Sequence, residues 1–362
     1  MNKKSEHKSK LKEVEGIKQP EKINTTSINK IKLKRAKQPT VEQFVNFIKE
    51  GNITYLSKAI TLIESTNPKH KEKASKIINA CLPHANNSIR IGITGVPGVG
   101  KSTFIEALGK LLSSKGKKIA VLAIDPSSSV NKGSILGDKT RMEELVKDAN
   151  VFIRPSPSGD SLGGVARKTR ETIILCEAAG FDTIFIETVG VGQSETVVHS
   201  MVDFFLLLKL AGAGDELQGI KRGIIEMADA IVINKADADN KQAAKLAKAE
   251  FSRALHLYPL RDDKWSPKVT TCSALNNRGI DEVWNIINDY FKLIKSNNHF
   301  NIKRAKQNEF WLLETINQQL LDNFYQNKNI SSSLKEELNK INNQQTSPFQ
   351  AAEKLLGLFG KS

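Results

Sequence analysis

The spacing of apolar and polar positions along this 362-residue chain changes near residue 89. Before that point, Val41–Ile63 and His70–Ala80 place apolar residues three or four positions apart, which is typical of helices. These two segments predict a helical lead-in over residues 41–87. After it, short continuous apolar runs alternate with amphipathic segments.

Seven of these apolar runs are predicted to be strands. They are Ile89–Thr94, Ile119–Ile124, Val151–Ile153, Thr183–Glu187, Phe204–Leu210, Ala230–Ile233 and Lys268–Cys272. Between them, Ser102–Ser114, Val165–Ala179 and Asn240–Leu255 have helical spacing. Continuous apolar strands separated by helices are typical of a mostly parallel sheet with helices on both faces. The predicted fold class is therefore α/β, with this core over residues 88–280.

The strand pattern ends before Asp281, and segments rich in Asn and Gln follow. Gln307–Tyr325 and Pro348–Phe359 have helical spacing, so residues 281–362 are predicted to be a C-terminal helical extension. No apolar run approaches the roughly 18 residues that a membrane span needs, so no membrane association is expected.

The net charge of +15 is concentrated at the N-terminal end. Residues 1–40 hold eleven Lys and one Arg against four Glu, and they have almost no aromatic residues and no apolar periodicity. This composition predicts a disordered basic tail, for which a solvated state is favoured over a weak, salt-sensitive affinity for nucleic acid. The tail lacks an apolar signal region and contains glutamates, so a cytoplasmic location is expected.

A glycine-rich segment, Gly95–Ser102, lies between a predicted strand and a predicted helix and fits G-x-x-x-x-G-K-[ST]. Its glycines let successive backbone N–H groups face a phosphate. Lys101 can reach the β- and γ-phosphates, and Ser102 can offer a hydroxyl to Mg²⁺. A glycine-rich turn without a ligand is the alternative. The predicted phosphate-binding residues are Gly95, Val96, Pro97, Gly98, Val99, Gly100, Lys101, Ser102 and Thr103.

The sequence Asn234-Lys235-Ala236-Asp237 follows a later predicted strand and selects guanine over adenine. The Asp237 carboxylate can accept hydrogen bonds from the ring N–H and the exocyclic amine of guanine, and adenine lacks both donors at those positions. Asn234 is expected to connect this loop to the phosphate loop, and the Lys235 stem to lie over the base. After the next strand, Ser273, Ala274 and Leu275 are expected to supply a backbone N–H to the guanine oxygen.

The predicted catalytic side contains Lys101, Glu187 and Gly190. Glu187 ends a predicted strand and is expected to act on Mg²⁺ or its waters, while the Gly190 N–H can face the γ-phosphate. Asp125 also ends a strand, where carboxylates commonly belong to the site of such sheets, although it can instead start a turn before a proline. No glutamine follows Gly190 immediately, so slow intrinsic hydrolysis of GTP is expected.

Together these residues resemble the MeaB/ArgK family, the GTPase chaperones of cobalamin-dependent acyl-CoA mutases. The most specific stretches are Gly133–Arg141, Leu162–Thr169, Glu187–Ser194 and Gly212–Lys221. The resemblance implies a SIMIBI-class core, a homodimer made through the C-terminal helices, and GTP-gated loading of adenosylcobalamin onto methylmalonyl-CoA mutase or a relative, with protection of that enzyme. It also implies a magnesium site formed by Ser102, Asp125, Asp138 and Glu187, and a switch facing the mutase at Gly212–Lys221.

Three other functions fit parts of the sequence less well. A nickel-inserting GTPase usually carries a His-rich or Cys-containing metal store, whereas the six His and three Cys here are scattered. A kinase or ATPase serving amino-acid transport conflicts with the guanine-selecting loop. An RNA-associated GTPase would use the basic tail. The chain has no DxHxxG motif, so cobalamin is expected to be held by the partner enzyme.

Overall fold

The computed structural model describes residues 39–124, 142–155, 162–188, 194–212 and 222–360. Its centre is a seven-stranded sheet in which every pairing is parallel, as the apolar runs predict. The strands in their order across the sheet are β3 (Val151–Arg154), β2 (Ile119–Ile124), β4 (Thr183–Thr188), β1 (Ile89–Gly95), β5 (Phe204–Leu210), β6 (Ala230–Asn234) and β7 (Lys268–Thr271). Because the strands are parallel, all their carboxyl ends lie at one edge of the sheet, where ligands of such folds bind.

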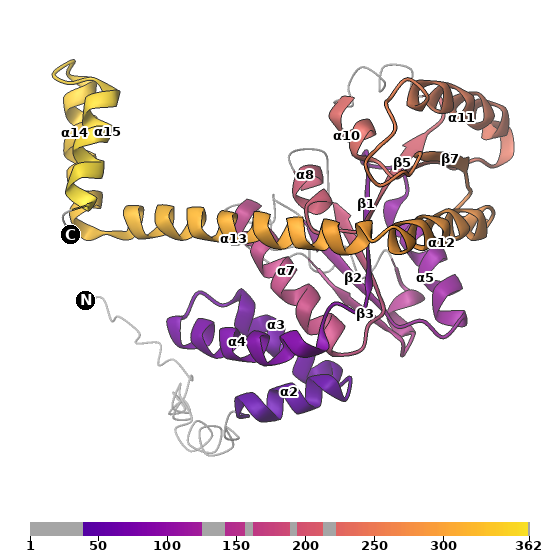
Figure 1. Cartoon of the computed structure of the whole chain (residues 1–362), viewed down its shortest axis with the longest axis horizontal. Coiled ribbons are helices and arrows are strands. Elements are labelled where there is room, and N and C mark those ends of the chain that lie inside the picture. The colour runs from indigo at the N-terminus through magenta and orange to yellow at the C-terminus, as the bar shows by residue number, and fades with distance from the viewer. Residues whose placement is uncertain (1–38, 125–141, 156–161, 189–193, 213–221, 361–362) are drawn as a thin grey trace, which may run out of the picture. The chain divides into compact units, whose positions relative to one another are not determined.

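Helices cover both faces of this sheet (Figure 1). Helices α2, α3, α4, α7 and α8 pack on one face, α5 and α12 pack on the other, and α10 and α11 pack beside β6. The helix bounds are α2 (Val41–Lys49), α3 (Ile53–Glu64), α4 (Pro68–Cys81), α5 (Lys101–Ser114), α7 (Leu162–Ala178), α8 (Ser194–His199), α10 (Arg222–Met227), α11 (Lys241–Leu255), α12 (Ile280–Ser296), α13 (His299–Gln326), α14 (Lys328–Asn342) and α15 (Pro348–Phe359).

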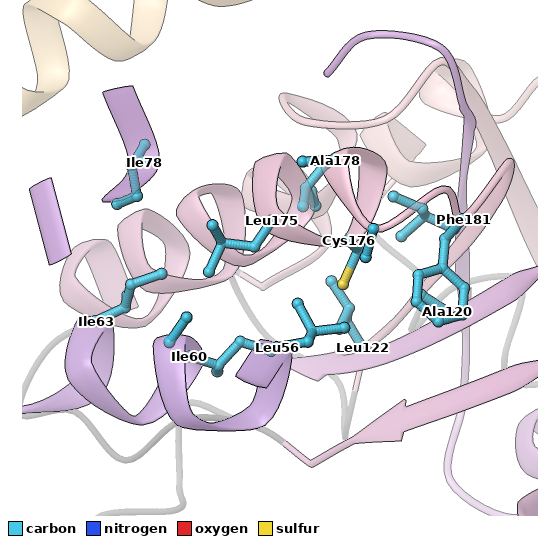
Figure 2. Packing of buried hydrophobic residues seen from close by; sticks show 14 of the residues in the cluster. Leu56, Ile60, Ile63, Ile78, Ala120, Leu122, Leu175, Cys176, Ala178 and Phe181 are labelled. Carbon is cyan, nitrogen blue, oxygen red and sulfur yellow. The ribbon is translucent and has the colours of Figure 1, made fainter. Parts of the chain in front are cut away.

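The N-terminal helices are part of the core of the first face (Figure 2). Apolar side chains of α3 such as Leu56 and Ile60 point toward Leu175 and Cys176 of α7 and toward Leu122 of β2. All five are almost inaccessible to solvent. The lead-in therefore stabilises the sheet directly, since each buried aliphatic side chain contributes about 1.5–3 kcal/mol.

The continuous helical spacing of Val41–Ile63 is interrupted in the structure, where two helices replace the single predicted stretch. Gly51 between them has φ +76°, a left-handed conformation that glycine adopts readily. The Asn52 side chain then accepts the N–H groups of Thr54 and Tyr55 at 3.1 and 3.3 Å and caps α3. The apolar spacing persists across the break because both helices bury one face in the same core.

The C-terminal part is helical, as predicted, and begins with α12 and α13. The first half of α13 is anchored by buried side chains, including Arg304 and Trp311, whereas the apolar residues after Trp311 are largely exposed. Helix α14 contacts α13 and α15, and the buried Glu337 of α14 pairs with Lys354 of α15 at 2.7 Å. Within the described residues, no helix combines the length and the apolar character that crossing a membrane requires.

Candidate guanine-nucleotide site

The glycine-rich loop curls tightly between β1 and α5, at the carboxyl edge of the sheet. Gly95 has φ +155°, and a Cβ there would lie 2.5 Å from the Leu208 carbonyl oxygen, so only glycine fits. Gly100 has φ +92° and forms the N-cap of α5. Val99 is fully buried and anchors the loop, whereas Pro97 and Gly98 are exposed. The loop therefore presents backbone N–H groups and the positive end of a 14-residue helix, a favourable anion site.

The Lys101 side chain lies inside this curl. Only 9% of the residue is exposed, and Nζ donates to the carbonyl oxygens of Gly95 at 2.8 Å and of Val96 at 3.3 Å. A positive charge is thus concentrated where the loop backbone can face phosphate oxygens. Thr103 follows on the first turn of α5 and is half-buried.

Ser102 and Glu187 meet beside the loop, with Ser102 Oγ 3.3 Å from Glu187 Oε1. Glu187 is 5% exposed and lies next to Ile93 of β1 in the strand register. One residue further along each strand, the Thr188 hydroxyl donates to the buried Thr94 hydroxyl at 2.9 Å, and this bond fixes the two strand ends. A hydroxyl and a carboxylate are the hard oxygen ligands that Mg²⁺ prefers, so this pair fits the predicted metal.

Three predicted site residues, Asp125, Asp138 and Gly190, lie outside the described residues. The same holds for most of the loop Gly212–Lys221 and for the stretch Gly133–Arg141.

Asn234, at the end of β6, connects the two predicted nucleotide-binding loops. Its amide nitrogen Nδ2 donates to the Val99 carbonyl oxygen at 2.9 Å, which joins the guanine loop to the phosphate loop. Its Oδ1 accepts the Ala274 N–H at 3.1 Å and the Cys272 thiol at 3.3 Å. The residue is 1% exposed, so these bonds hold the amide in one orientation.

Asp237 is oriented by Ser273, whose hydroxyl donates to Asp237 Oδ2. Lys235 is exposed and has φ +58°, and its carbonyl oxygen accepts Asn240 Nδ2 at 2.9 Å. Of the three residues predicted to face the guanine oxygen, Ser273 and Ala274 bond to the Asn234–Asp237 loop, and the Leu275 side chain is 78% exposed. The structure therefore brings the residues of both guanine motifs together.

Cys272 helps to orient the Asn234–Asp237 loop, a role that the sequence pattern did not identify. The thiol is 2% exposed, and burial, with a smaller contribution from the Asp237 charge, raises its pKa to about 12. It is therefore a neutral donor that orients Asn234. As one apolar position in a strand, it carries no signal that distinguishes it from a core residue.

An α/β sheet of parallel strands, a glycine loop between β1 and α5, and an Asn-Lys-x-Asp loop after β6 define a P-loop protein of the GTPase class.

Residues 56–329 match the family described as "Methylmalonyl Co-A mutase-associated GTPase MeaB", and the chain belongs to that family. It is 44% identical over 311 residues to the GTPase ArgK of Escherichia coli (strain K12), covering 86% of this chain and 94% of ArgK. It is 42% identical over 332 residues to the mitochondrial methylmalonic aciduria type A homolog of Mus musculus, covering 89% of this chain and 80% of that protein. A solved structure titled LAO/AO transport system kinase superposes with a TM-score of 0.72 at 37% identity, covering 90% of this chain and 99% of that chain. The predicted family and fold class are thus confirmed.

Proposed function

We propose that this protein binds GTP and GDP with Mg²⁺, hydrolyses GTP slowly, and acts as a chaperone for a cobalamin-dependent acyl-CoA mutase. The observation that carries the nucleotide part is the hydrogen-bond set of Asn234, which joins the phosphate loop to the residues that orient Asp237. A carboxylate held in this way accepts both guanine donors and would be left unpaired by adenine.

The phosphate side supports a Mg²⁺-dependent hydrolase. Lys101 would bind the phosphate oxygens, and Ser102 and Glu187 would hold Mg²⁺, with Asp125 and Asp138 as further ligands by family resemblance. The metal, when bound, neutralises charge that develops on the phosphate oxygens. Gly190 would sense the γ-phosphate through its backbone N–H. Because no glutamine follows Gly190 immediately, we expect a slow intrinsic rate until a partner completes the site.

The partner assignment rests on the family. Its description names methylmalonyl-CoA mutase, and the relative from Mus musculus is named after methylmalonic aciduria. We propose that GTP binding and hydrolysis gate adenosylcobalamin loading onto methylmalonyl-CoA mutase or a close relative and protect that enzyme. By family resemblance, we assign the stretch Gly212–Lys221, which follows β5 in the sequence, to mutase contact.

A homodimer through the C-terminal helices is supported by the apolar residues that α13 and α15 leave exposed. A monomer rarely exposes so many large apolar residues on neighbouring helices, and such a surface is typical of a protein interface. The exposed large apolar residues of these two helices after Trp311 are Leu312, Leu313, Ile316, Leu320, Leu321 and Tyr325 on α13 and Phe349, Leu356 and Leu358 on α15.

The nucleotide proposal is tested by calorimetric titration of the purified protein with GDP and then with ADP in Mg²⁺. We expect GDP to bind tightly and ADP not to bind. Asp237→Ala should abolish GDP binding, while the matched variant Asp239→Ala, two residues along the same loop and exposed, should bind like the wild type. ADP binding as tight as GDP binding would refute the role of Asp237.

The partner proposal is tested by passing the same protein over immobilised methylmalonyl-CoA mutase with GDP and with a non-hydrolysable GTP analogue. Capture that changes with the nucleotide supports a GTP-gated chaperone. GDP binding without mutase capture under either condition would retain the GTPase and reject this partner.

A further inference from the structure

One face of α13 is fastened to the short segment that joins α8 to β5. Arg304 donates to both carboxylate oxygens of Asp203, from Nε at 2.5 Å and from Nη2 at 2.7 Å. Gln307 Nε2 donates to the Val202 carbonyl oxygen at 2.8 Å, and Trp311 Nε1 donates to the Ser200 carbonyl oxygen at 3.2 Å. We call these three side chains the α13 staple. They lie three and four positions apart, on one face of the helix.

The segment bonded by the staple, Ser200–Asp203, directly follows α8 in the chain. Helix α8 in turn follows β4, the strand that carries Glu187. Strand β4 ends at Thr188, one residue after Glu187, and the chain reaches α8 at Ser194. Helix α8, with six residues, is therefore the described element that lies along the chain between β4 and the staple.

Helix α8 is packed closely against the strand that leads into the phosphate loop. A Cβ at Gly92 of β1 would lie 2.9 Å from Val198 Cγ1 and 3.0 Å from Val202 Cγ2. Val198, Met201 and Val202 are fully buried. Val198 of α8 and Val202 of the stapled segment pack side by side on Gly92, so a displacement of α8 must displace the stapled segment with it.

The last residue of α8 lies among the charges at the base of α13. Burial, followed by the Lys303 charge, lowers the pKa of His199 to about 4, and the ring packs edge-on against Phe205 at 5.5 Å between centroids. Lys303 itself donates to the Asp203 carbonyl oxygen at 2.6 Å. The segment Ser200–Asp203 is therefore bonded to α13 at both ends, through Trp311 at one and through Lys303 and Arg304 at the other.

A second contact links α13 to α7. Arg170 of α7 donates from Nη2 to Asn308 Oδ1 at 2.7 Å, and its guanidinium lies 5.1 Å from the centroid of the Trp311 ring. Trp311 thus contacts both α7 and Ser200, the first residue after α8. It is also the last buried residue of α13, before the exposed apolar residues begin.

From this arrangement we infer that the α13 staple couples the nucleotide site to the C-terminal helices. A change of nucleotide shifts α8, α8 shifts α13 through Gln307 and Trp311, and contacts made by the C-terminal helices change nucleotide affinity in return. The reciprocal effect is required because a coupling free energy between two sites acts equally on both. This inference rests on the proposed nucleotide binding.

The test compares two dissociation constants, for GDP and for a non-hydrolysable GTP analogue, measured by calorimetry on the full chain. Gln307→Ala and Trp311→Phe each remove one staple hydrogen bond and keep the Arg304–Asp203 ion pair. We expect the ratio of the two constants to change at least about five-fold, the lower range of measured allosteric couplings. A role in stability alone would lower the melting temperature and leave this ratio unchanged.

Two matched controls make the same chemical changes elsewhere. Gln319→Ala alters an exposed glutamine on the same helix, and Trp284→Phe alters a buried tryptophan of α12 in the core of the opposite sheet face. Both should keep the wild-type ratio of dissociation constants. If Trp311→Phe does not fold, Gln307→Ala decides the question alone.

A distance measurement provides a second readout. Spin labels on cysteines introduced at the exposed positions Lys245 of α11 and Asn317 of α13 report the position of α13 against the core, with labelled chain diluted in unlabelled chain. The distance should differ between GDP and the GTP analogue in the wild type and lose this difference in both staple variants. Unchanged ratios together with an unchanged distance, in a protein that binds both nucleotides, would overturn the inference and leave the proposed function standing. Failure of the wild type to bind either nucleotide would instead reject the proposed function.

Discussion

Replacing Arg304 by Met tests how strongly the buried ion pair at the base of α13 stabilises the fold. The Arg304 and Asp203 side chains are 10% and 1% exposed. Besides its two bonds to Asp203, the guanidinium donates to the Ser88 carbonyl oxygen at 3.0 Å. Methionine keeps most of the apolar stem but leaves the Asp203 carboxylate buried without its principal cation.

The expected cost follows from that uncompensated charge. Breaking a buried ion pair by removing one partner costs about 3–5 kcal/mol. Asp203 Oδ2 also accepts the Arg90 N–H at 2.8 Å, and the Lys303 ammonium lies nearby on the Asp203 carbonyl oxygen, so we expect the lower end of this range. For a chain of this size, a loss of about 3 kcal/mol corresponds to a melting temperature lowered by roughly 4 °C.

The assay is urea unfolding followed by circular dichroism, with a double-mutant cycle. Adding Asp203→Asn to Arg304→Met removes the unpaired charge but keeps a carbonyl acceptor for the Arg90 N–H, and it should recover about half of the lost stability. The matched control is Arg167→Met, which removes a partly exposed pair with Glu171 at 3.0 Å and should cost about 1 kcal/mol. A cost for Arg304→Met no larger than for Arg167→Met would refute the reasoning, as would a double variant that is less stable than the single one.

Three further predictions concern the nucleotide site and α8. Asp237→Asn should weaken GDP binding by a factor of about 100 and favour xanthosine diphosphate, because the new amide can donate to a carbonyl at the position of the guanine amine. Calorimetry with both nucleotides measures this change, and an unchanged preference for GDP would contradict it. Gly100→Ala adds a Cβ 2.8 Å from Asn234 Nδ2 at φ +92° and should weaken GDP binding at least about ten-fold. The control Gly116→Ala, at φ +78° with nothing within 4 Å of its Cβ, should lower stability by about 1–2 kcal/mol and leave GDP affinity unchanged. Equal GDP affinities in the two variants would count against the clash at Gly100. Burial lowers the pKa of His199 to about 4, below the value of about 6.5 in the unfolded chain, so the unfolded chain binds the proton first and stability falls by about 2 kcal/mol from this residue as pH drops from 7 to 5. His199→Gln should remove that part of the loss, measured by urea unfolding at the two pH values. Identical pH dependences of stability in the wild type and the variant would show that His199 titrates normally.

The sheet could be predicted from the sequence because its strands are buried on both faces. The run Phe204–Leu210 is apolar except for Lys209, and the structure places all of that strand in the sheet with bounds identical to the predicted ones. The break at Gly51 was missed because the two helices it separates bury the same face, so the apolar spacing does not change there.

The nucleotide loops could be predicted because each requires special residues at fixed spacing. Gly95, for example, has no alternative at a position where a Cβ would meet a backbone oxygen at 2.5 Å. The positioning residues could not be predicted in this way. Cys272 and Gln307 act through single hydrogen bonds to partners 38 and 105 positions away in the chain, and nothing in their local sequence indicates those partners.

The two strands that end the sheet, β3 and β7, have four residues each and are the shortest of the seven. The outer side of a terminal strand carries unpaired backbone groups, onto which a strand from another molecule can add. Short terminal strands offer few such groups, and in β7 the Thr270 side chain is further engaged with Glu282 at 2.6 Å. Growth of the sheet from one molecule to the next, the usual route to fibrous aggregates, is therefore disfavoured at both of its margins.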